Sequence, residues 1–139
     1  MSWTIKYNEN LQIIELTYLG RVTGEEIKEA AVARIKMGKN KGATKFLIDT
    51  KNMETDESAT LDIYDVPEQI FPEEKFNRTN HIAILEPESP TSKEMVNFFI
   101  AVCVNRGWLA MTFHDRESAV KWLQQPTFQQ PPANTSSEN

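Results

Sequence analysis

Short apolar runs alternate with helical patterns along most of this chain. Residues 3–7 (WTIKY) and 12–19 (QIIELTYL) are strand-like and are joined by an Asn-Glu-Asn cluster, which predicts an antiparallel hairpin. Residues 46–48 (FLI) and 81–85 (HIAIL) are apolar without alternation, as in parallel strands that are covered on both faces. The pattern predicts a last strand at residues 108–113.

Start and stop signals place a helix after the hairpin. Thr23 and Glu26 have the spacing of a capping box. The bases of this helix, Arg34 among them, follow toward its end and suit the helix dipole, and Gly38 and Gly42 are predicted to stop it. Its predicted apolar face carries Ile27, Ala30, Ala31 and Ile35.

Three further helices are predicted. Ser58 begins the second helix, which Pro67 should kink or divide because an interior proline removes a hydrogen bond and clashes with the preceding turn. Thr91 and Glu94 form a second capping box before the third helix. Asp115 is the predicted cap of a short final helix.

These elements follow the order β-β-α-β-α-β-α-β-α. The order predicts one α/β domain, residues 1–124, built on a mixed, mostly parallel sheet of about five strands. At 139 residues the chain can bury about two thirds of its unfolded surface without the help of a metal or a disulfide. Residues 125–139 have three prolines and no periodicity, and we expect them to form a disordered tail.

The third predicted helix is apolar on nearly all sides between residues 95 and 104. Such a helix must be buried on nearly all sides. Two interpretations remain open: the helix is packed deeply within the domain, or Val96, Ile100 and Val104 face a second subunit in a homodimer.

Charge and composition narrow the class of partner. A formal charge of −5 and a pI near 5.1 argue against non-specific binding of nucleic acid. The longest apolar run, residues 98–104, is far shorter than the roughly 20 residues that span a bilayer, so no membrane insertion is expected. The single cysteine, Cys103, lies in an apolar helix and is expected to be an inert thiol. With no secretory pattern at the start of the chain, we expect a cytoplasmic protein.

Several segments resemble the SpoIIAA-like family of bacterial proteins, also described as STAS/SEC14 domain proteins. The resemblance covers about residues 3–124 and is carried by WTIKYNENLQIIELTYLGRVTGEE, KFLIDT, HIAIL, NFFIAVCVNRGW and FHDRESAVKWL. It implies a STAS-like fold and says little about activity. The similarity to STAS domains implies a regulatory module that binds a protein partner. The similarity to SEC14 domains implies a carrier of a small apolar ligand or lipid.

The same resemblance singles out Ser58. Anti-sigma-factor antagonists of the STAS type have a strand similar to FLIDT that ends in a polar residue. Nine residues after that polar residue comes the phosphorylated serine of a D-S-S-G motif, which lies at the start of a helix. Ser58 has this spacing from Asp49, and Glu57 stands in the place of the aspartate. Ala59 and Thr60 replace the second serine and the glycine. Ser58 is therefore a candidate phosphorylation switch, and an ordinary helix N-cap is the alternative.

Acidic residues cluster after the central strand. Residues 51–76 contain eight acids and two lysines, which indicates either a solvated acidic face or a docking surface for a basic partner. In open α/β sheets, ligands bind beyond the carboxyl ends of the parallel strands. The predicted ligand or partner edge comprises Asp49, Lys51, Glu57, Asp62, Glu86, His114 and Asp115.

No catalytic or cofactor motif accompanies this edge. The chain lacks the GxxxxGK[ST] and GxGxxG phosphate-binding patterns, so we assign no cofactor or catalytic residue and expect a non-enzymatic protein. Convergence of Asp49, Glu86, His114 and Asp115 would allow a divalent metal site, but no short-range ligand spacing supports it and no metal is predicted. His81, at the start of a strand, is expected to be structural.

Two functions therefore remain open. One is a regulatory or protein-interaction module that uses the acidic edge, with Ser58 as a switch. The other is a small-ligand carrier with an apolar pocket between residues 61–71 and 95–104. A cavity of roughly 300 Å³ or more would favour the carrier.

Overall fold

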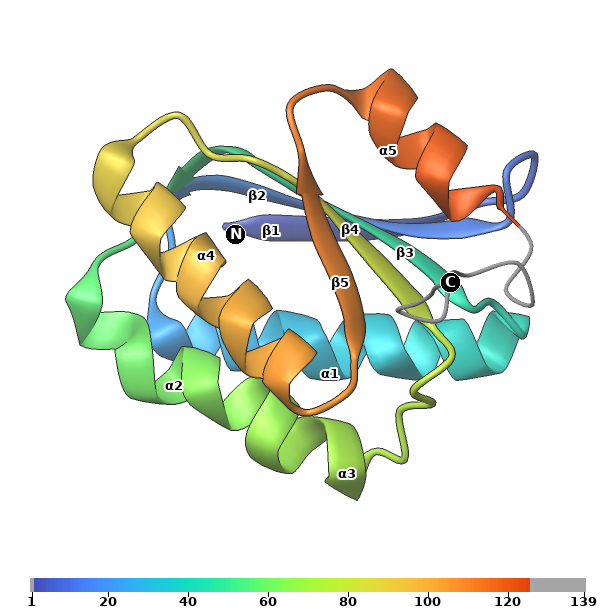
Figure 1. Ribbon diagram of the computed structural model, residues 1–139, viewed down its shortest axis with the longest axis horizontal. Coiled ribbons are helices and arrows are strands. Elements are labelled where there is room, and N and C mark those ends of the chain that lie inside the picture. Colours follow the sequence, from blue (N-terminus) through green and yellow to red (C-terminus); the bar gives the residue numbers. More distant parts are fainter. Residues whose placement is uncertain (1, 126–139) are drawn as a thin grey trace, which may run out of the picture.

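The computed structural model describes residues 2–125, so the predicted tail lies outside the described residues except for Gln125. A five-stranded sheet with the order β1-β2-β3-β4-β5 forms the centre of the molecule (Figure 1). β1 and β2 are antiparallel, and every other neighbouring pair is parallel. The strands are β1 (Trp3–Asn8), β2 (Ile13–Arg21), β3 (Lys45–Glu54), β4 (His81–Leu85) and β5 (Leu109–Phe113).

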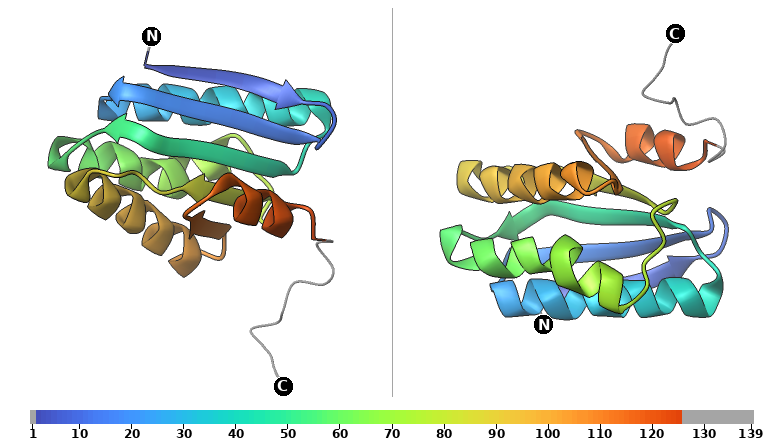
Figure 2. Two further views of the ribbon diagram at one scale, coloured as in Figure 1. Left: turned by 90° about the horizontal axis from the view of Figure 1, so that it is seen from above. Right: turned by 60° about the horizontal axis from the view of Figure 1, so that its bottom comes forward.

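The helices cover the two faces of the sheet unequally. One large core joins α1, α2, η2, α3 and α4 to one face, and a smaller core joins α5 to the other. Figure 2 (left) shows α5 in front of the sheet and α1 behind it. The helical elements are α1 (Gly24–Lys41), η1 (Glu57–Ala59), α2 (Thr60–Asp65), η2 (Val66–Ile70), α3 (Phe71–Glu73), α4 (Pro90–Asn105) and α5 (Arg116–Leu123). The predicted fold class is confirmed. None of these helices is long and apolar enough to cross a membrane.

The start of α1 matches the prediction and its end matches in part. Thr23 caps the helix, and its hydroxyl accepts the Glu26 amide while the Glu26 carboxylate accepts the Thr23 amide. Gly42 closes the helix in the left-handed conformation, with φ of 65°. The prediction that Gly38 also stops the helix is wrong. Gly38 lies inside α1, where an added Cβ would be 2.7 Å from the ring of Phe46, so this glycine serves packing against the sheet.

Pro67 interrupts the second helix as predicted. α2 ends at Asp65, and a π-helical turn, η2, carries the chain past the proline. In this wider turn the amide of Phe71 donates to the carbonyl of Val66, five residues earlier. Val66 and Ile70, at the two ends of this turn, both face the core.

The predicted capping box at Thr91 and Glu94 is wrong. α4 begins at Pro90, and Ser89 caps it by accepting the amide of Ser92 at 3.1 Å. A proline suits the first helical position because its ring fixes φ and no amide hydrogen is needed there.

The interpretation that α4 is packed deeply within the domain on nearly all sides is wrong, because one side of the helix is exposed in the single chain. Val96, Phe99 and Cys103 are buried in the large core, whereas Val104 is 55% exposed and Ile100 is half-buried. Val96 therefore does not belong to an outward apolar face. Ile100 and Val104 remain as its candidates.

Candidate functional site

Three places in the structure gather chemically informative side chains. The first is a polar cluster at the start of α5, the second is the surface around Ser58, and the third is a cavity inside the large core. The first two contain site residues predicted from the sequence. The third lies between residues 61–71 and 95–104, where the sequence predicted an apolar pocket.

The cluster at the start of α5 brings four predicted residues together. Asp49 is level with Leu85, the last residue of β4, so it lies beside the carboxyl end of β4 as predicted, although β3 itself continues to Glu54. Nδ1 of His114 lies 3.0 Å from Oε2 of Glu86. Asp115 caps α5 by accepting the amide of Ser118 at 2.8 Å, and this hydrogen bond is the main cause that lowers the pKa of Asp115.

The ion pair between Glu15 and Arg116, which also lies in this cluster, was not predicted from the sequence. Arg116 holds the buried carboxylate of Glu15 with two hydrogen bonds, of 2.9 and 2.6 Å. The hydrogen bond from Arg116 is the largest cause that lowers the pKa of Glu15, and Asn8 adds a third donor at 2.9 Å. A glutamate inside an apolar strand was the available signal, because such a residue needs a buried partner.

This geometry favours structural pairing over metal binding. Among residues 2–125, no group of three or more His, Cys, Asp or Glu side chains has the arrangement of a metal site. The carboxylates at the start of α5 are engaged with the His114 ring, the Arg116 guanidinium and backbone amides.

Ser58 lies on the exposed turn that follows β3. β3 runs to Glu54, past the predicted end of the strand at Asp49, and η1 follows at once. Asp56, and not Ser58, is the cap: its Oδ1 accepts the Ser58 amide at 3.0 Å and the Ser58 hydroxyl at 2.6 Å. The N-cap alternative for Ser58 is therefore wrong. The hydrogen bonds from Ser58 are the main causes that lower the pKa of Asp56.

The acidic segment is only partly neutralised by its neighbours. Arg21 pairs with Asp56 at 3.0 Å, and Lys28 lies 3.5 Å from Asp62 and 3.7 Å from Asp65. Arg106 pairs with Glu68 on the next turn of this helical segment. Within the described part of the chain, Glu54 and Glu57 are exposed and make no ion pair.

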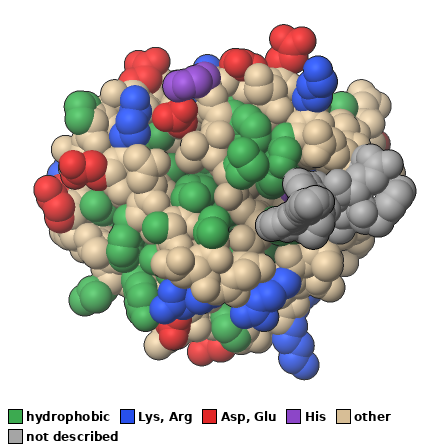
Figure 3. Space-filling model, viewed as in Figure 1, with side chains coloured by type: hydrophobic (Ala, Val, Ile, Leu, Met, Phe, Trp, Pro, Cys, Tyr) green, Lys and Arg blue, Asp and Glu red, His purple; other side chains and the backbone are tan. Residues whose placement is uncertain are grey.

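An exposed leucine lies beside this charge. Leu61 is 76% exposed, three residues after Ser58. We call Arg21, Glu54, Asp56, Glu57, Ser58 and Leu61 the Ser58 surface. Figure 3 shows further hydrophobic side chains over α2 and α4, the elements that carry Leu61, Ile100 and Val104.

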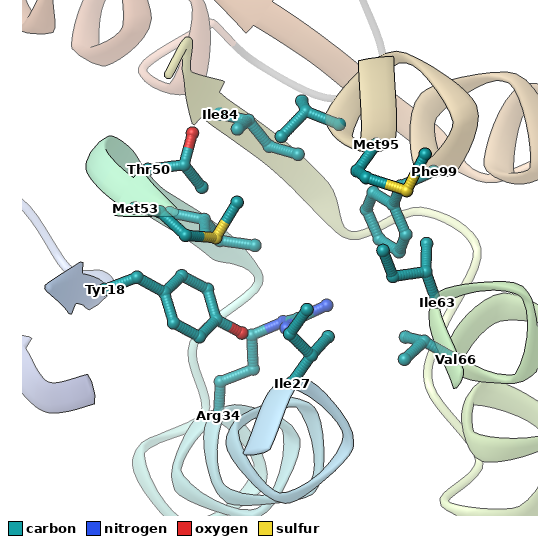
Figure 4. Close-up of a pocket in the computed structure, with 12 residues that line it drawn as sticks. Tyr18, Ile27, Arg34, Thr50, Met53, Ile63, Val66, Ile84, Met95 and Phe99 are labelled. Carbon is teal, nitrogen blue, oxygen red and sulfur yellow. The ribbon is translucent and has the colours of Figure 1, made fainter. Parts of the chain in front are cut away.

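The cavity lies between the sheet and helices α1, α2 and α4. It has a volume of about 50 Å³, and all but a few of its walls are aliphatic, aromatic or thioether groups. Figure 4 shows Arg34 reaching from α1 into its centre, beside the hydroxyl of Tyr18. The lining residues include Tyr18, Ile27, Arg34, Met53, Ile63 and Phe99.

Arg34 is 3% exposed, and its Nε and Nη2 atoms have no hydrogen-bond partner among residues 2–125. Burial lowers its pKa. Burial also raises the pKa of Tyr18 to about 12 and that of Cys103 to about 12, so both groups stay neutral near pH 7. The sequence analysis placed Arg34 among the bases that suit the helix dipole. Its position three residues after Ala31, on the apolar stripe, was the signal of its burial.

The comparisons with known proteins bear on the fold. No protein-family model matches the chain, and no curated protein matches its sequence. Among solved structures it is similar to the anti-sigma factor antagonist SpoIIAA in its unphosphorylated form, with a TM-score of 0.52 and 14% identity over 88% of this chain and 97% of that one. The chain has a STAS-like fold. At this level of identity the similarity concerns the arrangement of strands and helices.

Proposed function

We propose that this chain is a non-enzymatic regulatory module that binds a protein partner through the Ser58 surface. The observation that carries the proposal is the exposed Ser58 turn itself, which directly follows the central strand of a STAS-like fold. The structurally similar protein is named as an antagonist of an anti-sigma factor.

The composition of the Ser58 surface supports a basic partner. Glu54 and Glu57 are unpaired within residues 2–125 and accessible, so a lysine or arginine of a partner can approach them. Leu61 supplies apolar area that binding would remove from water. An apolar contact with a charged rim is the usual anatomy of a protein interface.

The size of the cavity argues against the alternative of a lipid carrier. At about 50 Å³, the cavity is well below the roughly 300 Å³ at which ligand pockets usually begin. A lipid chain would have to displace core side chains of α1, α2 or α4.

Phosphorylation of Ser58 would act as a release signal in this proposal. Its hydroxyl already donates to Asp56, and Glu57 is adjacent, so a phosphate dianion would meet two carboxylates. The repulsion would open the η1 turn and change the shape that the partner recognises.

Site-specific photo-crosslinking in cells tests this proposal. A photoreactive amino acid at Leu61 is expected to give one discrete adduct, identified by mass spectrometry, because Leu61 lies in the interface. The same amino acid at Glu117, exposed on α5, is the matched control and is expected to give no such adduct.

The partner found in this way is then purified and mixed with the wild-type chain. The proposal is supported if Ser58→Asp binds at least about fivefold more weakly than the wild type. It is refuted if position 61 gives no adduct, or if positions 61 and 117 give the same adducts.

A further inference from the structure

Arg34 has a buried guanidinium that is unpaired within the described part of the chain and plays no part in the proposed function. A buried guanidinium without an acceptor is among the most unfavourable groups in a protein interior, because it loses its hydration and gains nothing in return. Within residues 2–125, none of the carboxylates lies within ion-pair distance of Arg34. The titratable groups that act on it are the neutral Tyr18 and Cys103.

An anion would compensate both the charge of Arg34 and its hydrogen-bond donors that are unpaired among residues 2–125, whereas water or a neutral carbonyl would satisfy only the donors. Nε and Nη2 lie along one edge of the guanidinium, and that edge matches the two oxygens of a carboxylate. The hydroxyl of Tyr18 lies beside the group in Figure 4 and offers another donor. The ring of Phe71 packs near the guanidinium, with 5.9 Å between Cζ of Arg34 and the ring centroid, so that side is occupied.

The cavity limits the size and polarity of this anion. A cavity needs roughly 10–15 Å³ to hold one water molecule, which has a single heavy atom. By that measure a cavity of about 50 Å³ holds a molecule of about three to five heavy atoms. Its walls include Ile27, Ile63 and Phe99, which suit a methyl group and exclude a second charge.

We propose that the cavity between the sheet and helices α1, α2 and α4 is a binding site for a small monocarboxylate of the size of acetate or propionate. The carboxylate pairs with Arg34 and accepts a hydrogen bond from Tyr18, and the short alkyl group faces the aliphatic walls. The site is separate from the Ser58 surface, so its test does not depend on the proposed partner.

The position of the cavity is consistent with ligand entry. Thr50 and Met53 belong to the second half of β3, so the cavity lies toward the carboxyl ends of the parallel strands. This is the end of an open α/β sheet where ligands bind. Ile27 lies on the first turns of α1 and flanks it on the same side.

Thermal melts of the full chain test the site. Sodium acetate and sodium propionate are expected to raise the Tm by about 5 °C for each tenfold increase in concentration above the dissociation constant. Sodium chloride at the same ionic strength and acetamide, a neutral molecule of the same size, are the controls and should give no comparable rise. Sodium hexanoate should also fail, because it exceeds the cavity.

Arg34→Met keeps an unbranched side chain as long as the arginine stem up to Nε, and it removes the guanidinium and its charge. We expect this variant to melt at the same temperature as the wild type or higher without anion, because an uncompensated charge has been removed, and to lose the response to acetate. Lys36→Met, which removes an exposed charge from the same helix, should respond to acetate as the wild type does.

A direct measurement keeps the proposal testable if Arg34→Met does not fold. Carbon-13 NMR of labelled acetate with the wild-type chain should show binding that propionate displaces, and Tyr18→Phe should weaken it about threefold or more. The proposal is overturned if acetate acts no more strongly than chloride or acetamide. It is equally overturned if Arg34→Met retains the acetate response, or if hexanoate binds as well as acetate.

Discussion

His81 shows how one buried side chain can make the stability of this protein depend on pH. Its ring is fully buried at the start of β4 and packs edge-on against Trp122, with 5.0 Å between the ring centroids. Burial, together with the nearby charge of Lys45, lowers the pKa of His81 below its ordinary value of 6.5. The expectation of a structural role for His81 agrees with this setting.

Because the pKa of His81 is lowered in the folded state, the protein should become less stable as the pH falls. As the pH falls through 6.5, the unfolded chain takes up a proton at His81 and the folded chain does not, so the unfolded state is favoured. We expect the free energy of unfolding to be intact above about pH 7 and to fall below it, by at most about 1.4 kcal/mol per pH unit from this residue. Thermal melts between pH 7.5 and 5.5 measure the slope.

One variant tests the contribution of His81 directly. His81→Leu should flatten the slope, because it removes the buried imidazole. An unchanged slope in His81→Leu would show that protonation of His81 is not responsible.

Asp56 and Ser58 differ in what they do for the η1 turn. Asp56 accepts two hydrogen bonds and pairs with Arg21, whereas the Ser58 hydroxyl makes a single exposed hydrogen bond. We therefore expect Asp56→Ala to lower the Tm more than Ser58→Ala does. Ser58→Asp should also lower the Tm more than Ser58→Ala does, because the new carboxylate is repelled by Asp56. Melts of the three variants give the order. A loss for Ser58→Ala as large as that for Asp56→Ala would mean that the serine is itself the structural residue.

Elements whose local signals agree with one another were predicted well from the sequence. α1 was predictable because the cap and the first-turn acids agree at its start, and the last-turn bases and Gly42 agree at its end. The start of α4 was missed because Ser89-Pro90 and Thr91-Glu94 both have start signals, and the fixed φ of Pro90 favours the earlier one. Gly38 was misread because its role depends on Phe46, which only the fold brings near.

The two sides of α4 should respond differently to charge. Val96→Glu buries an unpaired carboxylate in the core and should unfold the protein, at a cost of several kcal/mol. Val104→Glu changes a 55% exposed position and should alter the free energy of unfolding by less than about 0.5 kcal/mol. Circular dichroism melts of the two variants test this difference.

Val104→Glu also tests the interpretation that α4 faces a second subunit in a homodimer. If Ile100 and Val104 form a subunit interface, Val104→Glu should give a folded monomer where the wild type is a dimer, as measured by light scattering. A wild-type monomer at tens of micromolar would remove the dimer proposal.

At the scale of the whole molecule, the fold was more predictable than the sites. Strand runs and crossover helices are local patterns, and the right order of elements leaves few arrangements open. The pairing of Glu15 with Arg116 joins residues 101 positions apart, and the burial of Arg34 depends on three helices closing over it. Nearby residues indicate that Glu15 and Arg34 are buried, but they do not indicate which distant groups surround them. The Ser58 turn was located because its position is counted from the central strand.

The Ser58 surface is proposed to bind a basic protein partner. The most direct test is the affinity of the cross-linked partner for the wild type and for the double variant Glu54→Lys and Glu57→Lys, measured by calorimetry at low and physiological salt. We expect the double variant to bind at least tenfold more weakly, with Glu117→Lys on α5 unchanged, because reversed charges repel a basic surface. Equal affinities of the wild type and the double variant would contradict the claim.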